Sequence, residues 1–103
     1  MSILQLLFGG GNRVDLKEFI EQGAFLVDVR SAAEYAAGHV KGSVNIPLNT
    51  MVSELSKFKD KKYIIVFCRS GNRSGQAKLI LEQHSFTNVI NGGTWEYVNQ
   101  FIK

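Results

Sequence analysis

Cysteine and histidine are scarce in this chain of 103 residues, which has one cysteine and two histidines. A single cysteine excludes an internal disulfide framework. Zinc is also disfavoured, because there is no second cysteine and because His39 and His84 lie far apart, without the spacing of metal ligands. The sequence therefore predicts a domain without a metal or other cofactor. Its lone thiol is easiest to keep reduced in the cytoplasm, which is the location we expect.

A long hydrophobic run is also missing. The chain opens with MSILQLLFGGGNR, whose apolar part is far too short to span a bilayer. This segment lacks the basic region with which a secretory signal begins. We therefore interpret residues 1–11 as a short leader that ends in glycines, and residues 12–103 as one domain without a membrane segment.

A strong charge of one sign is absent too, since the net charge is +3. The densest basic cluster, KFKDKK at residues 57–62, contains Asp60 and is typical of a solvated turn. No aromatic residues alternate with a basic stripe, as a stacking platform for nucleic acid requires. These features disfavour nucleic acid as a partner and are compatible with a small anionic substrate.

Helix and strand signals alternate along the chain. Short apolar segments typical of strands occupy residues 24–29, 43–47, 63–67 and 88–90. Helical patterns separate them, and the last helix is expected over residues 94–102 with Trp95, Val98 and Ile102 on one side. This alternation predicts an α/β fold with a mainly parallel central sheet and helices on both faces.

Two of the expected helices begin with capping signals. Asp15 is followed three positions later by Glu18, and Ser31 is followed in the same way by Glu34, so each pair predicts a capping box. Gly23 is placed to end the first helix in the left-handed conformation. The helix after residue 47 is expected to bury Met51, Val52, Leu55 and Phe58, and the helix over residues 73–84 is expected to bury Ala77, Ile80 and Leu81.

The single thiol stands where chemistry is expected. Cys68 ends the strongest apolar segment and is followed by RSGNRS, which would not line an apolar core. In parallel sheets, ligands bind beyond the carboxyl ends of the strands. Backbone N–H groups of the turn, the start of the next helix, and the charges of Arg69 and Arg73 all favour a thiolate there. We predict that Cys68 is a nucleophile.

The length of this loop bears on the substrate. Four residues separate Cys68 from Arg73, one fewer than in cysteine-dependent phosphatases. A shorter cradle suits a single atom, such as a sulfane sulfur, better than a tetrahedral phosphate. The spacing therefore favours sulfur transfer but leaves a phosphatase or arsenate reductase as an alternative.

Four motifs in order resemble the single-domain rhodanese family of thiosulfate-type sulfurtransferases. They are LVDVR at residues 26–30, EYAAGHVKGSVNIP at 34–47, IVFCRSGNRS at 65–74 and NGGTWEY at 91–97. The resemblance covers nearly the whole chain from Val14 onward. It implies an α/β domain in which Cys68 takes sulfur from a donor such as thiosulfate and passes it, as a persulfide, to cyanide or a thiol.

The resemblance also implies which residues form the site. Cys68 would be catalytic, Asp28 and Arg30 would support the loop, and the substrate would be bound by Arg69, Ser70, Gly71, Asn72, Arg73 and Ser74. Arg30 is expected to pair with Glu34 or with a backbone carbonyl. A protein-bound persulfide is compatible as an alternative donor. A non-enzymatic sulfur-relay or interaction module is a further alternative.

Other matched residues have structural interpretations. Asn45 and Pro47 are expected to fix a turn, and Gly92 and Gly93 to let a turn approach the site. Trp95 is expected to pack in the core or to form a wall of the site.

Overall fold

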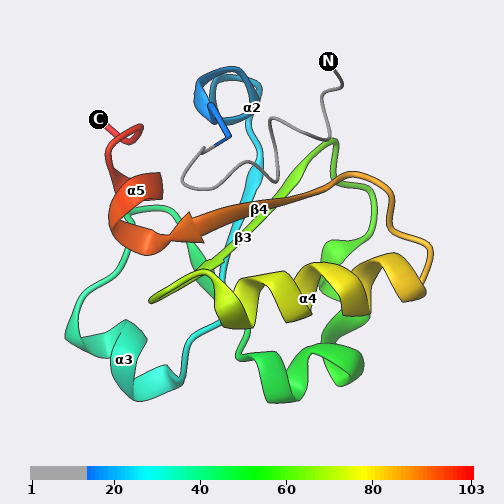
Figure 1. Ribbon diagram of the computed structural model, residues 1–103. Helices are drawn as coiled ribbons and strands as arrows, with labels where there is room; N and C mark the ends of the chain where they lie inside the picture. The colour runs from blue at the N-terminus through cyan, green and yellow to red at the C-terminus, as the bar shows by residue number, and fades with distance from the viewer. Residues whose placement is uncertain (1–13) are drawn as a thin grey trace.

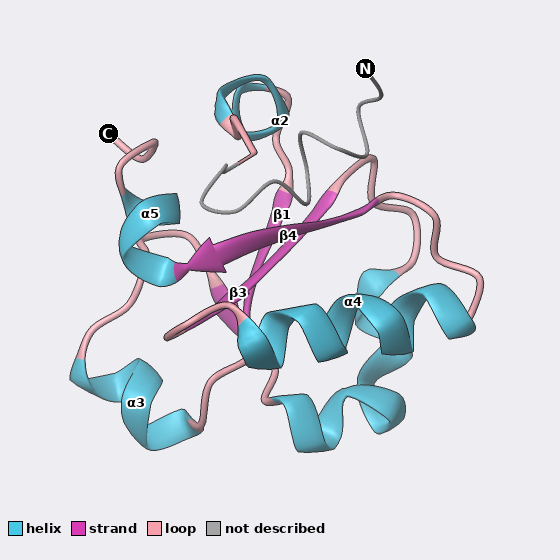
Figure 2. Ribbon diagram, viewed as in Figure 1, coloured by secondary structure: helices cyan, strands magenta, loops and turns pink. Residues whose placement is uncertain are grey.

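A parallel sheet forms the centre of the computed structural model, which describes residues 14–103 (Figures 1 and 2). The strands are β1 (Phe25–Asp28), β2 (Val44–Asn45), β3 (Ile64–Cys68) and β4 (Val89–Thr94). They lie in the order β2-β1-β3-β4, and every neighbouring pair is parallel. The α/β fold predicted from the sequence is thereby confirmed. The interpretation of residues 1–11 as a leader lies outside the described residues.

Helical segments cover both faces of the sheet. They are α2 (Lys17–Glu21), α3 (Ala32–Ala37), η1 (Leu48–Phe58), α4 (Asn72–Gln83) and α5 (Trp95–Asn99). Helices α2 and α5 lie on one side of the strands, and α4 lies on the other (Figure 1). Within residues 14–103, no helix combines the length and the apolar character that crossing a membrane demands.

Strand β3 is buried along its whole length and contributes to two separate cores. Ile64, Val66 and Cys68 belong to the core that includes residues of η1 and α4. Ile65 and Phe67 alternate with them and belong to the other core, with α2 and α5. Because successive strand residues face opposite sides of the sheet, the run without polar alternation fits a strand that is covered on both faces. The thiol of Cys68 accordingly belongs to the α4 side.

One of the two predicted capping boxes is present. The N–H of Ser31 donates to Glu34 Oε1 at 3.0 Å, and the N–H of Glu34 donates to Ser31 Oγ at 3.2 Å. The box predicted at Asp15 is wrong. The Asp15 carboxylate instead accepts the N–H of Lys17 at 3.0 Å, and α2 begins with no side-chain cap. An aspartate can bond a backbone group two positions on, and this short turn replaces the cap.

The segment after β2 differs from the regular helix that the sequence predicts. It is a 3₁₀ helix, η1, with a non-helical backbone at Glu54. Met51 and Phe58 are buried as expected, but Val52 is 59% exposed, so the prediction for Val52 is wrong. Tighter winding and the break at Glu54 change which side chains share a face, and Val52 turns outward.

Strand β4 extends further than the sequence suggests. Gly92 and Gly93, expected in a turn, lie inside β4, where the pairing with β3 shifts register between Val66 and Phe67. A Cβ atom on Gly92 would lie 2.8 Å from Ile65 Cγ2 and 3.0 Å from Val98 Cγ2. Gly92 therefore allows β3, β4 and α5 to pack closely.

Candidate active site

Cys68 is the last residue of β3, so its side chain lies at the carboxyl edge of the sheet. The chain turns at Gly71, whose φ of +95° is left-handed and favours glycine. Helix α4 starts at the next residue. This turn directs the N–H of Gly71 to Cys68 Sγ, at a distance of 3.0 Å.

Opposing effects set the pKa of the Cys68 thiol. The residue is fully buried, and burial raises the pKa. The Ser74 hydroxyl and the backbone N–H groups of Ser74, Ser70 and Gly71 lower it. These hydrogen bonds prevail, and the pKa lies below that of an ordinary thiol. The pocket of donors therefore favours the thiolate, which is the nucleophilic form of cysteine.

Arg73, in the first turn of α4, is held by a carboxylate. Its guanidinium donates to both oxygens of Glu34, at 2.7 and 3.0 Å. Arg73, together with the Ser31 N–H, lowers the pKa of Glu34 to about 2. Glu34 in turn raises the pKa of Arg73. The pair connects α3 to the start of α4. It also offsets the positive charge of Arg73, which the sequence predicts as a substrate-binding group.

Arg30 is buried and has different partners. Its guanidinium contacts the Asp28 carboxylate at 2.7 Å and donates to the Gly38 carbonyl at 2.7 Å. Of the two expected partners the carbonyl is present, but the carboxylate is Asp28 and not Glu34. Asp28 lies at the same buried strand edge, whereas Glu34 is already bonded to Ser31 and Arg73.

Two further side chains contact this group of residues around Arg30 at the end of β1. Asn45 donates to the carbonyls of Asp28 and Arg30 at 3.0 and 2.9 Å. The Trp95 ring lies 4.7 Å from Arg30 Cζ and also packs against the core that includes Val98. Arg30 thus connects β1, the end of α3 and the start of α5.

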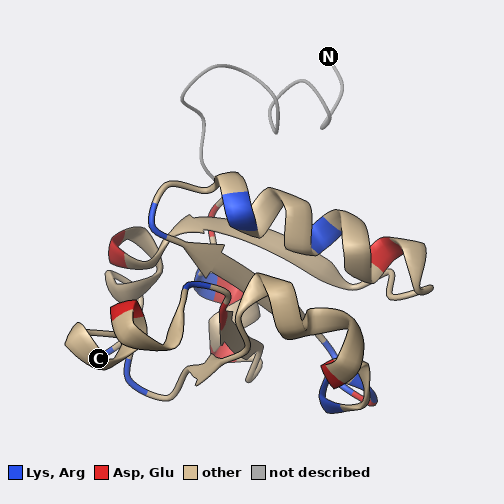
Figure 3. Cartoon of the chain, turned by 90° about the horizontal axis from the view of Figure 1, so that it is seen from below, with Lys and Arg blue, Asp and Glu red and all other residues tan. Residues whose placement is uncertain are grey.

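The six loop residues expected to bind substrate divide into three groups. Gly71 and Ser74 contact the thiol, and Arg73 is paired with Glu34. Arg69, Ser70 and Asn72 are exposed. Within the described part of the chain, Arg69 forms no ion pair. Elsewhere, basic and acidic residues occur together on the same elements, as on α4 (Figure 3).

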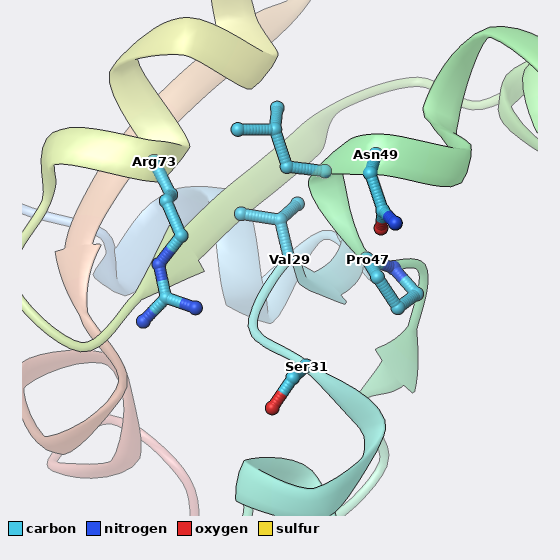
Figure 4. Close-up of a pocket in the computed structure, with 6 residues that line it drawn as sticks. Val29, Ser31, Pro47, Asn49 and Arg73 are labelled. Carbon is cyan, nitrogen blue, oxygen red and sulfur yellow. The ribbon is translucent and has the colours of Figure 1, made fainter.

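An open pocket of about 330 Å³ lies beside the loop (Figure 4). It is lined by Val29, Ser31, Pro47, Leu48, Asn49 and Arg73. Val29 donates its N–H to the Phe67 carbonyl at 2.9 Å, so the pocket adjoins the strand end that carries Cys68. In Figure 4 the Arg73 side chain extends along one side of this space. The pocket combines an apolar lining with one cationic group.

Neither histidine contacts Cys68. His39 stacks on Tyr35 and bonds the Tyr35 carbonyl at 2.8 Å, and His84 bonds the Ile80 carbonyl at 2.9 Å. Among residues 14–103, no three His, Cys, Asp or Glu side chains gather as metal ligands would.

Sequence reasoning missed one residue of the site. Asn91, on β4, accepts the Ser74 hydroxyl on Oδ1 at 2.7 Å. Asn91 precedes the two glycines of β4, and nothing in that pattern indicates a partner 17 residues earlier on another element.

The family comparison agrees with this geometry. Residues 12–100 match the rhodanese-like domain. This chain belongs to the rhodanese-like family. The resemblance drawn from the four sequence motifs is thereby confirmed.

Among similar proteins, the thiosulfate sulfurtransferase PspE of Escherichia coli is 39% identical over 69 residues, covering 65% of this chain and 66% of PspE. A tRNA uridine(34) hydroxylase of Hamiltonella defensa is 34% identical over 83 residues, covering 73% of this chain and 23% of that protein. The chain thus spans less than two thirds of the length of either relative. Its rhodanese-like fold also superposes on the human single-domain sulfurtransferase TSTD1 with a TM-score of 0.71, at 29% identity, covering 85% of this chain and 92% of TSTD1.

Proposed function

We propose that this chain is a sulfurtransferase that carries a sulfane sulfur on Cys68. Its family and its relative PspE support sulfur transfer in general. One observation carries the finer proposal: Cys68 Sγ, at the end of β3, accepts the Gly71 N–H at 3.0 Å and lies 3.5 Å from the Ser74 hydroxyl. These donors stabilise negative charge on sulfur, and a sulfur nucleophile needs that charge.

In the first step, the Cys68 thiolate attacks the outer sulfur of thiosulfate. A bond forms between Sγ and that sulfur, and the bond from the outer sulfur to the sulfonate breaks. Sulfite leaves with the electron pair, and the enzyme retains a negatively charged persulfide. This is covalent catalysis, in which one transfer becomes two displacements.

In the second step, an acceptor such as cyanide or a thiolate attacks the terminal sulfur of the persulfide. The sulfur–sulfur bond breaks, and Sγ regains its thiolate charge. With cyanide the product is thiocyanate, and no proton is gained or lost. Backbone N–H groups of the loop would hold charge on the terminal sulfur in the persulfide state, as an oxyanion hole holds charge on oxygen.

Donor binding would depend on Arg69 more than on Arg73. Arg69 is exposed and next to the thiol, whereas the charge of Arg73 is offset by Glu34. Because Cys68 is fully buried, the exposed residues Arg69 and Ser70 would have to shift as the outer sulfur of the donor approaches. The adjoining pocket offers room for the rest of a donor or acceptor.

Two observations bear on the rival functions. The Gly71 N–H already points at Sγ, so the short loop closes on one atom rather than around a phosphate. No histidine contacts the thiol. A protein-bound persulfide as the donor would use the same Cys68 chemistry and would make this chain a relay. A cytoplasmic location suits the proposal, because the free thiol has to remain reduced.

A turnover comparison tests this function. The wild-type protein should produce thiocyanate from thiosulfate and cyanide and should show negligible hydrolysis of an aryl phosphate. Cys68→Ser should fold and lose the thiocyanate activity, because a serine hydroxyl is not ionised near neutral pH and forms no persulfide. Efficient phosphate hydrolysis, or substantial thiocyanate production by Cys68→Ser, would exclude the proposal.

A further inference from the structure

The Ser74 hydroxyl is fully buried. It has a single proton but three polar atoms close to its oxygen. Its oxygen lies 2.7 Å from Asn91 Oδ1, 3.1 Å from the Gly71 carbonyl and 3.5 Å from Cys68 Sγ. A hydroxyl donates one hydrogen bond and accepts others. The three neighbours therefore compete for one proton, and Asn91 Oδ1 is the nearest of them.

The orientation of the Asn91 amide follows from its other contact. The N–H of Gly93 donates to Asn91 Oδ1 at 3.0 Å, so the oxygen and not the nitrogen faces Ser74. The Asn91 nitrogen faces the Gly71 carbonyl, 3.5 Å away. Asn91 Oδ1 is thus an acceptor whose position is fixed by β4 itself.

These contacts form a complete chain when Cys68 is a thiol. The S–H donates to Ser74 Oγ, and the Ser74 O–H donates to Asn91 Oδ1. Each group in this chain has a partner. This arrangement is open only to the neutral thiol, the inactive form of the nucleophile, and it offsets part of the effect of the donors that lower the pKa of Cys68.

The chain is interrupted when the thiol loses its proton to solvent. Sγ then has no hydrogen to donate and needs donors, and the Ser74 hydroxyl is the only side-chain donor that contacts it within the described residues. To bond the thiolate, the Ser74 proton has to turn away from Asn91 Oδ1. The proton stays on the Ser74 oxygen throughout, and only its direction changes.

We infer that Asn91 is a positioning residue that acts through Ser74, by competing with Cys68 Sγ for the Ser74 hydroxyl proton. This inference rests on the proposed role of Cys68 as the sulfur carrier. Once a persulfide forms, negative charge moves to the terminal sulfur, and the hydroxyl is free to return to Asn91. Asn91 therefore limits how far the resting thiol is ionised, and it accepts the Ser74 hydrogen bond again after sulfur has been loaded.

The native charged groups around the thiol are unchanged in the variants proposed below. Arg73 on α4 is paired with Glu34 on α3, and Arg30 is paired with Asp28 at the end of β1. Arg69 is exposed in the loop. Their influence on the Cys68 thiolate therefore cancels when variants at Asn91 are compared with the wild type.

Two substitutions at Asn91 should change the apparent pKa of Cys68 in opposite directions. Asn91→Leu removes the competing acceptor at similar size, and the pKa should fall by about half a pH unit, the scale of one neutral hydrogen-bond competitor. Asn91→Asp keeps the shape but adds a negative charge and a stronger acceptor, and the pKa should rise by about one pH unit or more. The ultraviolet absorbance of the thiolate measures both, since Cys68 is the only cysteine.

A double-mutant cycle separates positioning from support of the fold. In a Ser74→Ala background there is no hydroxyl proton to direct, so adding Asn91→Leu should leave the pKa unchanged. Circular dichroism confirms that each variant is folded. If Asn91 merely supports the cradle, Asn91→Leu should instead raise the pKa by displacing the loop N–H groups.

A rise or no change in Asn91→Leu, an equal fall in the Ser74→Ala background, or no rise in Asn91→Asp would overturn the inference. The absorbance titration involves no sulfur donor or acceptor. Its result is therefore independent of whether the chain transfers sulfur from thiosulfate, and failure of the proposed function would be seen separately in the turnover assay.

Discussion

At the scale of single residues, the site places a buried sulfur among hydrogen-bond donors rather than next to a base. The pKa of Cys68 is raised by burial and lowered by Ser74 and by the loop N–H groups, with a net fall. Arg73, which the sequence suggests as a cation for the substrate, is bonded through both nitrogens to Glu34. This leaves Arg69 as the adjacent exposed cation, and it leads to a prediction about donor binding.

Arg69→Ala should raise the KM for thiosulfate about fivefold and leave kcat nearly unchanged, because an exposed charge pair contributes about 1 kcal/mol. Arg69→Lys, which retains the charge, is the matched control and should stay close to the wild type. The difference between the alanine and lysine variants should shrink at high salt. Steady-state kinetics at two ionic strengths measure these effects. An unchanged KM in Arg69→Ala would mean that Arg69 does not attract the donor.

At the scale of elements, close packing of β4 against β3 and α5 depends on Gly92. A methyl group there would meet Ile65 Cγ2 at 2.8 Å and Val98 Cγ2 at 3.0 Å. Gly92→Ala should therefore lower the free energy of unfolding by about 1–3 kcal/mol, the usual cost of overpacking. Denaturant unfolding followed by circular dichroism measures this change.

Gly75→Ala is the matched control for Gly92→Ala. Gly75 lies inside α4, and a Cβ atom there would meet Asn91 Nδ2 at an ordinary 3.6 Å. Because alanine favours the helix over glycine, this variant should be unchanged or more stable by about 0.5–1 kcal/mol. Equal destabilisation by the two substitutions would contradict the assignment of crowding to Gly92.

Local signals explain which elements were predictable from the sequence. The apolar run that becomes β3 and the Ser31–Glu34 capping box depend on neighbouring residues, and both are present. The outward turn of Val52 depends on the 3₁₀ winding of η1, and the extension of β4 through Gly92 depends on pairing with β3. Neither the winding of η1 nor the pairing of β4 with β3 is evident from a single sequence.

The same limit applies to the candidate site. The thiol, its loop and the helix that follows are contiguous in sequence, so their proximity was predictable. The bond from Arg73 to Glu34 joins residues 39 positions apart, and the bond from Ser74 to Asn91 joins residues 17 apart. The sequence predicts Glu34 only as a cap and a possible partner of Arg30, and it places Asn91 in a matched motif without a role.

At the scale of the whole molecule, the Glu34–Arg73 pair joins α3 to the start of α4. Arg73 lowers the pKa of Glu34 to about 2 from an ordinary 4.5. Because the folded pKa is depressed, ionised Glu34 stabilises the native state above pH 4.5. That contribution is lost as the pH falls from 4.5 towards 2.

Glu34→Gln should therefore lower Tm most near neutral pH. The difference in Tm between the variant and the wild type should disappear as the pH falls from 4.5 towards 2. Glutamine can still accept the Ser31 N–H, so the variant tests the charge. Glu82→Gln is a suitable control, because Glu82 pairs with Lys78 within α4 at 2.9 Å and exposed pairs of this kind contribute little. A Tm difference for Glu34→Gln that is constant from pH 7 to about 2 would show that its charge is not responsible.

The central claim is that Cys68 carries the transferred sulfur, and intact mass spectrometry tests it most directly. After incubation with thiosulfate and removal of the excess, the wild-type protein should gain the mass of one sulfur atom. Cyanide should remove this mass and release thiocyanate in equal amount. Cys68→Ser should gain nothing. A wild-type protein that takes up no sulfur, or a Cys68→Ser variant that takes it up equally well, would contradict the account.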